Sequence, residues 1–390
     1  MHSPHNIRVA VDGWYLGEVH RNTGIYAYTR ALLEEMRELA PNFPVEITPF
    51  VPRKSELASA PGFQPGSSPL LASERLWRYG GAWITTMLRR PDVLFSPSVN
   101  SLYGPMATPV VTTIHDLSPV LMPNFAPPAI LRKLRLFLNH AVRSSARLIA
   151  ISESCKRDLM RVYRVPESKI SVVYSGCDHS RFNPAQPQAE HLARLKAKHN
   201  IARPYVFHHG LIQPRKNLKR LIEAWAQILA RNPELQLDLV LAGKLGWQSD
   251  ELITTAKTLS SDRGRVVFTG PLSDEDLPLL LKGGLLVAIP SLYEGFCLPM
   301  VEAMACGVPV IAAKGSCLEE ISGGILRYFD PESVHGIAMC IESAITNDSL
   351  RQELAAAGLK RAQRFCWRRT AEETLNVLIK THQASIAGLQ

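Results

Sequence analysis

The sequence has no apolar run that approaches the roughly 18 residues needed to cross a bilayer. The residues before the first apolar stretch, Met1–Asn6, lack the basic region that opens a signal peptide. The stretch itself, Ile7–Val11, is only as long as a strand. We therefore expect neither a signal peptide nor a membrane anchor.

Cysteine pairs are also missing. The seven cysteines are odd in number, are spread along the chain and form no Cys-x-x-Cys motif. This pattern argues against a disulfide framework and a zinc ribbon, and it favours reduced thiols in the cytoplasm.

Charge of either sign is moderate, but it is unevenly distributed. The 390 residues are 46% hydrophobic and 20% charged, which is typical of a globular chain long enough for two domains. Residues 1–185 carry +7 of the net charge of +9. An acidic partner or surface is therefore expected to meet the first half of the chain.

Short apolar runs alternate with helical patterns throughout, and most runs are continuous. Continuous runs are typical of parallel strands covered on both faces, so the sequence predicts an α/β, doubly wound fold. We expect strands at Ile7–Val11, Val45–Phe50, Asp92–Phe95, Val110–Ile114, Arg147–Ile151, Ile170–Tyr174, Tyr205–His208, Leu237–Leu241, Val266–Thr269, Leu285–Ile289, Val308–Ile311 and Ile325–Tyr328.

A polar stretch with two prolines, Asn183–Gln188, predicts a seam between two lobes. We expect a first lobe at 1–190 and a second at 191–369, with a last helix at about 370–390 packing back on the first. Ligands of doubly wound sheets bind at the carboxyl ends of the strands. If the two edges face one another, the cleft between the lobes is the expected site.

A basic pair, Arg215 and Lys216, follows an expected strand that ends at Gly210 and precedes a helix capped by Asn217. Cations at a helix N-terminus oppose the helix dipole, and a bound phosphate would resolve that conflict. The alternative is a pair of solvated surface cations.

Two glutamates follow the strand Leu285–Ile289. Glu294 is expected in a loop, and Glu302 about one turn into a helix with Pro299 at its start and Gly307 just past its end. Carboxylates accept hydrogen bonds from vicinal hydroxyls, so the two can hold two ends of one ligand. The alternatives are a solvated acid at Glu294 and an acid that complements the helix dipole at Glu302.

Two segments resemble the signatures of the retaining glycosyltransferases of family four. The segment Ser291–Val310 reads S-L-Y-E-G-F-C-L-P-M-V-E-A-M-A-C-G-V-P-V and contains two glutamates separated by seven residues, and Gly210–Leu218 reads G-L-I-Q-P-R-K-N-L. The resemblance covers essentially the whole chain. It implies the GT-B fold, in which two Rossmann-like lobes face each other across a cleft, the first binding the acceptor and the second the nucleotide sugar.

The resemblance also implies roles for the residues of the second lobe. Arg215 and Lys216 would hold the donor diphosphate, Glu302 the ribose hydroxyls and Glu294 the hydroxyls of the donor sugar.

The backbone of the same lobe is implied to contribute as well. Gly210 and the amides at Phe296, Cys297 and Leu298 would cradle phosphate or sugar. Cys297 stands where the family usually has glycine, and this is tolerable if the residue has an ordinary negative φ.

In the first lobe, His115 directly follows the strand Val110–Ile114. A lone histidine at a strand end is more often structural, but the resemblance implies contact with the donor sugar near its reacting carbon. Asp116 is expected to orient either His115 or a backbone amide. The loop with Gly24 matches a glycine-rich family loop near the phosphates, and Ser152 is interpreted as a helix cap.

Two stretches carry the basic excess. One mixes cations with aromatic residues at Arg75, Trp77 and Arg78. The other begins an amphipathic helix at Pro128, with cations at Arg132, Lys133 and Arg135 and no acid before Arg147. Such helices lie on anionic membranes or hold lipid-linked phosphates. The alternative is a helix with one face in the core and a solvated basic back.

The resemblance implies transfer of a hexose, with retention at the anomeric carbon, to a hydroxyl of a lipid-linked oligosaccharide in bacterial O-antigen assembly. Mannose from GDP-mannose is the first choice of donor. The acidic stretch Asp274–Asp276 precedes a helix, and we interpret it as the cap of that helix rather than as a metal–diphosphate site. We therefore expect no metal and no cofactor besides the nucleotide sugar. The enzyme is expected in the cytoplasm, at the anionic inner face of the membrane, with no nucleic acid partner.

Three alternatives remain at this stage. The donor can be UDP-glucose or a dTDP- or UDP-hexose, or the chain can be a nucleotide-sugar epimerase, or it can bind sugar nucleotides without catalysis. The two spaced glutamates favour transfer over the last two.

Overall fold

The computed structural model describes residues 6–17, 23–51, 62, 64–65, 76–99, 101–124 and 126–387. They form two compact units: residues 1–121, 128–176 and 367–390 belong to the first, and 122–127 and 177–366 to the second. The division at Gly176 precedes the expected seam at residue 190. The reason is that the backbone of Cys177 already forms an isolated parallel β-bridge with the backbone of Cys366, which belongs to the second unit.

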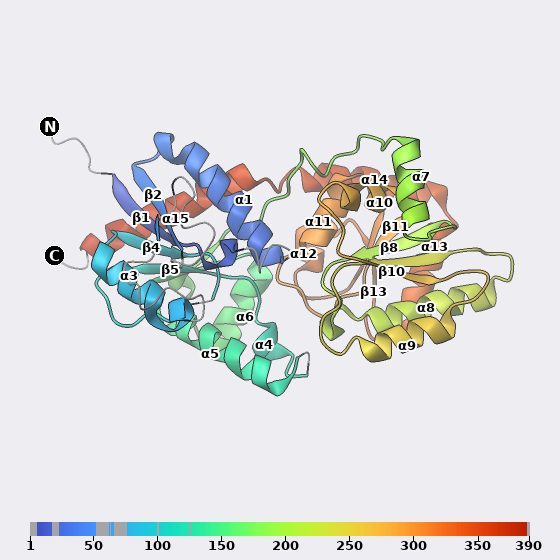
Figure 1. Cartoon of the computed structure of the whole chain (residues 1–390), viewed down its shortest axis with the longest axis horizontal. Coiled ribbons are helices and arrows are strands. Elements are labelled where there is room, and N and C mark those ends of the chain that lie inside the picture. Colours follow the sequence, from blue (N-terminus) through green and yellow to red (C-terminus); the bar gives the residue numbers. More distant parts are fainter. Residues whose placement is uncertain are drawn as a thin grey trace. The chain divides into compact units, whose positions relative to one another are not determined.

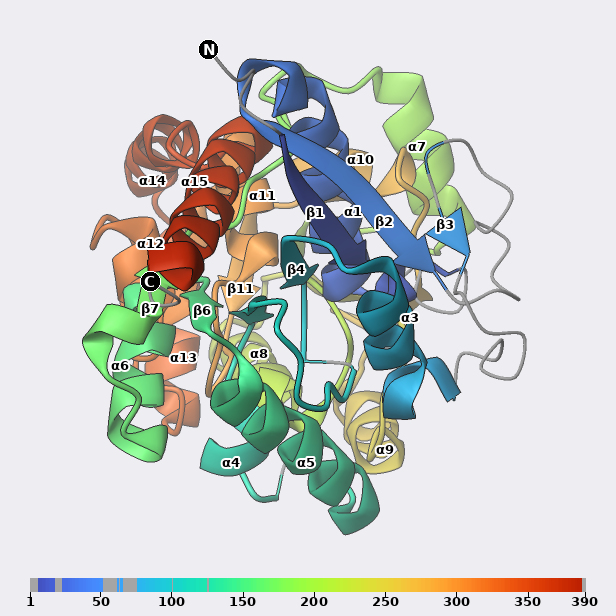
Figure 2. The same cartoon turned by 90° about the vertical axis from the view of Figure 1, so that its left-hand side faces the viewer.

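The first unit is built on a parallel sheet of seven strands (Figures 1 and 2). Its strands are β1 (Ile7–Asp12), β2 (Val45–Val51), β3 (Gln64–Pro65), β4 (Val93–Ser96), β5 (Val110–Ile114), β6 (Arg147–Ala150) and β7 (Ile170–Val172). Their order is β3-β2-β1-β4-β5-β6-β7. The order in which the chain adds strands therefore reverses between β1 and β4, while all the strands stay parallel.

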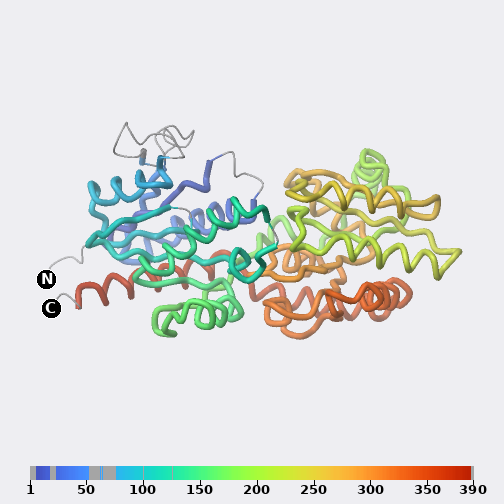
Figure 3. The backbone as a smooth tube through the Cα atoms, turned by 90° about the horizontal axis from the view of Figure 1, so that it is seen from below, coloured from blue at the N-terminus to red at the C-terminus, as the bar shows by residue number. Residues whose placement is uncertain are grey.

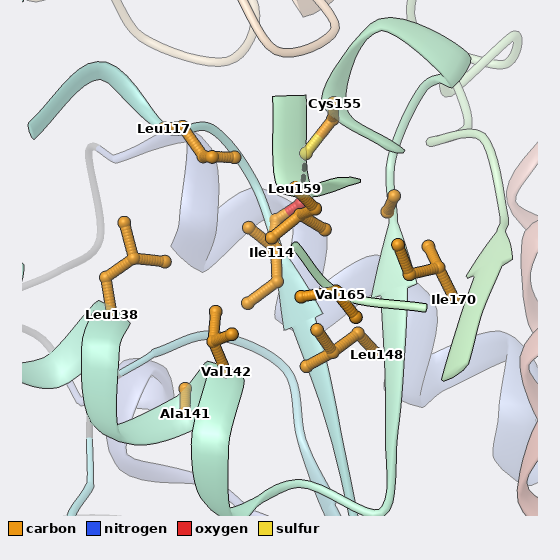
Figure 4. Packing of buried hydrophobic residues seen from close by; sticks show 11 residues of the cluster. Ile114, Leu117, Leu138, Ala141, Val142, Leu148, Cys155, Leu159, Val165 and Ile170 are labelled. Carbon is orange, nitrogen blue, oxygen red and sulfur yellow. Dashed lines mark hydrogen bonds between the residues drawn. The ribbon is translucent and has the colours of Figure 1, made fainter. Parts of the chain in front are cut away.

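The helices that the structure describes around this sheet are α1 (Gly24–Leu39), α3 (Ala82–Arg89), α4 (Ser118–Leu121), α5 (Pro128–Ser144), α6 (Glu153–Tyr163) and α15 (Trp367–Ala387). Helix α15 packs along α1 and contacts β1 and β4, and Figure 3 shows the end of the chain returning to this unit. In Figure 4, Leu138 and Val142 of α5 pack near Ile114 and Leu148, two buried strand residues. This packing fixes the end of β5, from which His115 follows.

The second unit contains six parallel strands in the order β10-β9-β8-β11-β12-β13. They are β8 (Tyr205–His209), β9 (Asp238–Ala242), β10 (Val266–Gly270), β11 (Leu286–Ile289), β12 (Val310–Ala313) and β13 (Arg327–Phe329). The helices are α7 (Ala189–Lys198), α8 (Leu218–Arg231), α9 (Asp250–Leu259), α10 (Asp276–Gly283), α11 (Leu298–Ala305), α12 (Leu318–Ser322), α13 (Val334–Ile345) and α14 (Asp348–Ala362). Figure 1 shows α8 and α9 on one side of this sheet and α7, α10 and α11 on the other.

The predicted α/β class is confirmed, and each of the twelve expected strands is present with ends shifted by at most two residues. Continuous apolar runs located these strands because both faces of each sheet are covered. The two-residue edge strand β3 was not predicted, since it has no apolar run of its own. No helix in the described part of the chain is long and apolar enough to span a membrane.

Two glycines allow the loops after β8 and β9 to approach closely. Gly210 and Gly243 have φ angles of 134° and 140°, in the region that favours glycine. A Cβ on Gly243 would lie 2.0 Å from the carbonyl oxygen of Gly210. The amide of Gly210 donates to the carbonyl of Ala242 at 2.9 Å, which locks the loops together.

Gly243→Ala should therefore destabilise the second unit by about 3 kcal/mol or more, since it combines a backbone clash with an unfavourable φ. Gly270→Ala is the matched control, because Gly270 has a φ of 70° but open space around its Cβ position. That variant should lose only about 1 kcal/mol. Urea unfolding of both variants measures the difference, and equal losses would show that the clash does not exist.

Candidate functional site

In the second sheet the strand order reverses between β8 and β11. Ligands of doubly wound sheets bind at such a switch point, outside the carboxyl ends of the strands. The loop after β8, residues 210–217, meets the loop after β11, residues 290–297. The amide of Leu292 donates to the carbonyl of Arg215 at 3.0 Å. The two segments that carry the predicted donor site are thus neighbours within one unit.

Asn217 tethers the first of these loops. Its Nδ2 donates to the carbonyls of Pro290, at 3.0 Å, and Pro331, at 2.7 Å. Asn217 stands at the N-cap of α8 as predicted, but it has a φ of 58° and its side chain makes no capping bond. Its tethering function was not anticipated, because both of its partners are distant in the sequence.

Glu294 holds the two predicted phosphate-binding cations. Its Oε2 accepts from Nη1 of Arg215 at 2.7 Å, and its Oε1 accepts from Nζ of Lys216 at 2.6 Å. The side chains of Arg215, Lys216 and Glu294 are only 12%, 8% and 6% exposed. Burial by itself would raise the pKa of Glu294, but Lys216 and Arg215 hold it at about 2, so the carboxylate is ionised.

This arrangement leaves two cations sharing one carboxylate, with an excess of positive charge at the strand ends. Arg215, Lys216 and Glu294 are all nearly buried, so the alternative interpretation of these residues as solvated surface charges does not hold. Both oxygens of Glu294 are engaged by the cations. The predicted contact of Glu294 with sugar hydroxyls would therefore have to use the remaining lone pairs of a carboxylate that is already held.

Glu302 lies on α11, and its Oε2 is 3.5 Å from Nε2 of His209 at the end of β8. Burial raises the pKa of Glu302 to about 7, with Arg181 opposing the shift and Asp274 and Asp178 adding to it. Burial also lowers the pKa of His209, to about 3, so the imidazole is neutral and the contact is no ion pair. Sequence analysis missed His209, although a histidine that ends an apolar strand was the available signal.

The helix of Glu302 begins as predicted, with Pro299 in its first turn and Gly307 just past its end at a φ of 68°. The condition set for a cysteine at position 297 is not met, because this residue has a φ of 69° rather than a negative one. A non-glycine residue in this left-handed region carries about 1–2 kcal/mol of strain. The Phe296 side chain is buried, and its ring packs edge-on against that of Phe365.

The two glycines assigned to the donor differ in their surroundings. A Cβ on Gly210 would lie 3.8 Å from Nζ of Lys216, so this glycine borders the basic pair. Gly24 opens α1 behind the N-cap Thr23, whose side chain accepts from the amide of Tyr26 at 3.2 Å. A Cβ on Gly24 meets no atom within 4 Å, so packing against described residues does not require this glycine.

His115 is part-buried after β5, with its ring edge-on to Tyr28 at a centroid distance of 4.6 Å. Its Nε2 is 2.8 Å from the carbonyl oxygen of Pro97. Because a carbonyl only accepts, Nε2 carries the proton and Nδ1 keeps its lone pair in the neutral ring. Burial lowers the pKa of His115, which favours that neutral form.

The neighbouring polar residues cap helices. Asp116 accepts from the amide of Ser118 at 2.9 Å, so it orients a backbone amide at the start of α4. Ser152 accepts from the amide of Cys155 at 3.0 Å, which confirms the predicted cap of α6. Ser273 rather than an acid bonds the first amide of α10, that of Asp276, at 3.0 Å.

The predicted acceptor and membrane residues divide into buried and exposed groups. Trp77 is buried, and Arg78 lies over the rings of Trp14 and Phe137, at 4.5 and 4.3 Å. Arg135 donates to the carbonyl of Pro119 at 2.6 Å and so links α5 to α4.

Arg132 and Lys133 are exposed on α5, whereas Arg75 lies outside the described residues. Trp77 and Arg135 are therefore structural in this state.

Sequence analysis also missed a buried carboxylate at the switch point of the first sheet. Asp12 ends β1, and its Oδ2 accepts from Ser101 Oγ at 2.5 Å and from the Tyr103 hydroxyl at 2.7 Å. Its Oδ1 accepts from Nε1 of Trp77 at 2.9 Å. Asp12 thus organises the strand ends of this unit, and its side-chain partners, some 65 to 91 residues away, gave no local signal.

Comparison with known proteins agrees with this geometry. Residues 193–361 match the family model described as glycosyl transferases group 1, and residues 23–181 match that of glycosyltransferase family 4. The O-antigen chain mannosyltransferase B of Escherichia coli is 31% identical over 266 residues, which cover 68% of this chain and 69% of the relative. A D-inositol 3-phosphate glycosyltransferase of Nocardioides sp. is 32% identical over 252 residues, covering 60% and 54%.

Among solved structures, the sucrose-phosphate synthase of Thermosynechococcus elongatus superposes with a TM-score of 0.73 at 19% identity, covering 97% of this chain and all of that one. At this identity the likeness concerns the fold, and it extends over both units. The two family models and the relatedness to the E. coli enzyme carry the assignment further. The chain belongs to the family-four glycosyltransferases, which have the GT-B fold.

Proposed function

We propose that this glycosyltransferase moves mannose from GDP-mannose to a hydroxyl of a lipid-linked oligosaccharide during assembly of a bacterial surface polysaccharide, with retention at the anomeric carbon. The buried cluster of Arg215, Lys216 and Glu294 is the observation that carries the donor half of this proposal. The relative that assembles mannose into O-antigen supports the choice of sugar and acceptor.

Arg215 and Lys216 bind the diphosphate of the donor. Their excess positive charge over Glu294 matches an anion, and the cluster is buried enough that the attraction is weakly screened by water. As the C1–oxygen bond to phosphate breaks, negative charge grows on the leaving diphosphate. Cations that are already in place stabilise that charge without reorganising.

Retention requires the acceptor hydroxyl to approach on the face that the diphosphate leaves. In the proposed step the new acceptor–C1 bond forms as the C1–phosphate bond breaks, and the acceptor proton passes to a phosphate oxygen. We propose that His115, whose tautomer is fixed by the Pro97 carbonyl, is the residue that contacts the sugar near C1. Because the two cations are already in place to stabilise the leaving group, the reaction is proposed to need no metal.

A different donor or acceptor is the second candidate function. The D-inositol 3-phosphate glycosyltransferase relative, which is about as similar in identity as the mannosyltransferase, favours it. The donor site described above would also serve a UDP-hexose, since diphosphate and ribose are common to GDP and UDP donors, whereas a dTDP-hexose shares the diphosphate but lacks the ribose 2′-hydroxyl.

Incubation with GDP-mannose, UDP-glucose and dTDP-glucose, each with a lipid-linked oligosaccharide, tests the function directly. Mannosyl transfer from GDP-mannose is expected, with retained configuration in the NMR spectrum of the product. Arg215→Ala and Lys216→Ala should each lower turnover by more than about tenfold while circular dichroism shows a folded chain. Inversion, or normal turnover in both variants, would contradict the mechanism.

The Glu302 carboxyl predicts a pH dependence of nucleotide binding. We propose that ionised Glu302 accepts hydrogen bonds from the ribose hydroxyls. Its pKa is raised to about 7, so below that pH the carboxyl is protonated and accepts hydrogen bonds from the hydroxyls less strongly than the carboxylate does. GDP affinity measured by calorimetry should therefore rise by about tenfold from pH 6 to pH 8.

Glu302→Gln is the control, because it cannot ionise. The variant should bind GDP more weakly at pH 8, and any remaining slope with pH reports the titration of the nucleotide itself. Identical slopes in the wild type and the variant would exclude a role for ionised Glu302.

We also propose that α5 and the neighbouring segment Leu76–Leu88 contact an anionic membrane surface. Arg132 and Lys133 are exposed on α5, and Leu136 beside them is 50% exposed. The neighbouring segment exposes Tyr79 at 48% and Leu88 at 63%. Exposed apolar side chains among cations favour the boundary between water and anionic headgroups.

Removing the two cations, Arg132→Ala with Lys133→Ala, should lower partitioning onto phosphatidylglycerol vesicles by about 30-fold, since each contributes about 1 kcal/mol. Co-sedimentation measures this partitioning. Lys257→Ala with Lys314→Ala removes the same charge from exposed positions of the second unit and should have little effect. Equal losses in both double variants would mean that net charge, and not this surface, drives binding.

A further inference from the structure

A cavity of about 700 Å³ lies in the second unit between the first turns of α8 and α9. Helices α8 and α9 cover one face of the sheet, and α11, which carries Glu302, lies on the opposite face (Figure 1). The volume of the cavity is within the range of small-molecule sites. None of the contacts assigned to the donor involves this cavity.

The floor of the cavity is rigid. Ile212 and Leu245 form an isolated parallel bridge between the loops after β8 and β9. The amide of Gly246 donates to the carbonyl of Ile212 at 2.7 Å, and a Cβ on Gly246 would lie 2.6 Å from the same oxygen. The loop that carries Trp247 is thus fixed in position before any ligand binds.

The lining combines one large aromatic side chain, Trp247, with polar groups on two walls. Lys219 and Glu251 form an ion pair across the space between α8 and α9. Arg220 donates to Oδ1 of Asn217 at 2.9 Å. The five ionisable side chains of the lining are Lys219, Arg220, Glu223, Asp250 and Glu251, and carboxylates outnumber cations.

This lining decides among ligand classes. An excess of carboxylates repels a phosphate or a nucleotide, and the many charged groups oppose a purely apolar ligand. Carboxylates, an amide and cations side by side suit a neutral ligand with many hydroxyls, each of which donates and accepts. An indole face suits the apolar C–H face of a sugar ring.

We propose that this cavity is a saccharide-binding subsite, which holds a neutral segment of the acceptor glycan, with Trp247 as its stacking platform. The assignment of the saccharide to the acceptor rests on the proposed function. The wall formed by Gln213, Pro214 and Asn217 belongs to the loop that also carries Arg215 and Lys216. A glycan seated here therefore contacts the same loop as the donor diphosphate.

Saturation-transfer NMR on the full chain, without nucleotide, tests the subsite independently of transfer. The probes are tetraoses of mannose, glucose and galactose and the corresponding monosaccharides. At least one tetraose should bind, and Trp247→Ala should weaken its binding by about tenfold, whereas Trp247→Phe stays within about threefold. No binding by any tetraose, or unchanged binding by Trp247→Ala, would overturn the proposal.

Two further variants guard against a folding effect. Glu223→Gln keeps the size of a lining side chain but removes its charge, and it should weaken tetraose binding as well. Leu245→Ala changes a 44% exposed side chain of the same loop that is not part of the lining, and it should bind like the wild type. If Leu245→Ala loses as much as Trp247→Ala, loop disruption rather than stacking explains the loss, and the proposal fails.

Failure of the subsite and failure of the proposed function are distinguishable. If wild-type protein binds a tetraose but transfers no sugar from any donor, the function is wrong and the subsite stands. If transfer proceeds but Trp247→Ala keeps the wild-type KM for a long lipid-linked acceptor, the cavity holds no acceptor glycan. GDP affinity should be the same in the wild type and Trp247→Ala in either case.

Discussion

A single buried carboxylate, Glu294, determines how much positive charge the second unit presents at its switch point. Two nearly buried cations without a counter-charge would each be destabilised by several kcal/mol, and Glu294 offsets this cost for both. The compensation is incomplete, because one carboxylate faces two cations. The uncompensated charge lies where the loops after β8 and β11 meet, so the proposed affinity of the site for an anion would follow from the way in which the unit folds.

The two glutamates of the motif are only eight positions apart, yet their environments drive their pKa values in opposite directions. Glu294 is held at about 2 by Lys216 and Arg215, whereas Glu302 is raised to about 7 by burial beside a neutral His209. Environments that separate two carboxyl groups in this way assign them different tasks. Glu294 is a permanent charge that positions the cations, whereas Glu302 reaches its full acceptor capacity only when its proton leaves.

Periodicity in the sequence located the strands because burial on both faces leaves a continuous apolar run, as in Val110–Ile114. The motif likewise located Arg215, Lys216 and Glu294, which the structure brings into contact. It did not reveal that Glu294 is fully engaged by the cations, since that depends on two loops 78 residues apart. The Asp12 network was beyond reach for the same reason. The positive φ of Cys297 was hidden because the residue type argued against it, and only the surrounding loop imposes it.

The short helical turn Pro214–Lys216 has two functional sides, and its rigidity follows from Asn217. The cations on this turn meet Glu294, while Pro214 and Asn217 border the cavity with Trp247. Because the Asn217 carboxamide is bonded to the carbonyls of Pro290 and Pro331, a ligand on one side cannot displace the turn without breaking these bonds. A fixed turn would therefore hold the proposed saccharide in the cavity and the proposed diphosphate at the cations at a constant separation. Such a separation is what a transferase needs, since the rate of the reaction depends on the placement of both reactants.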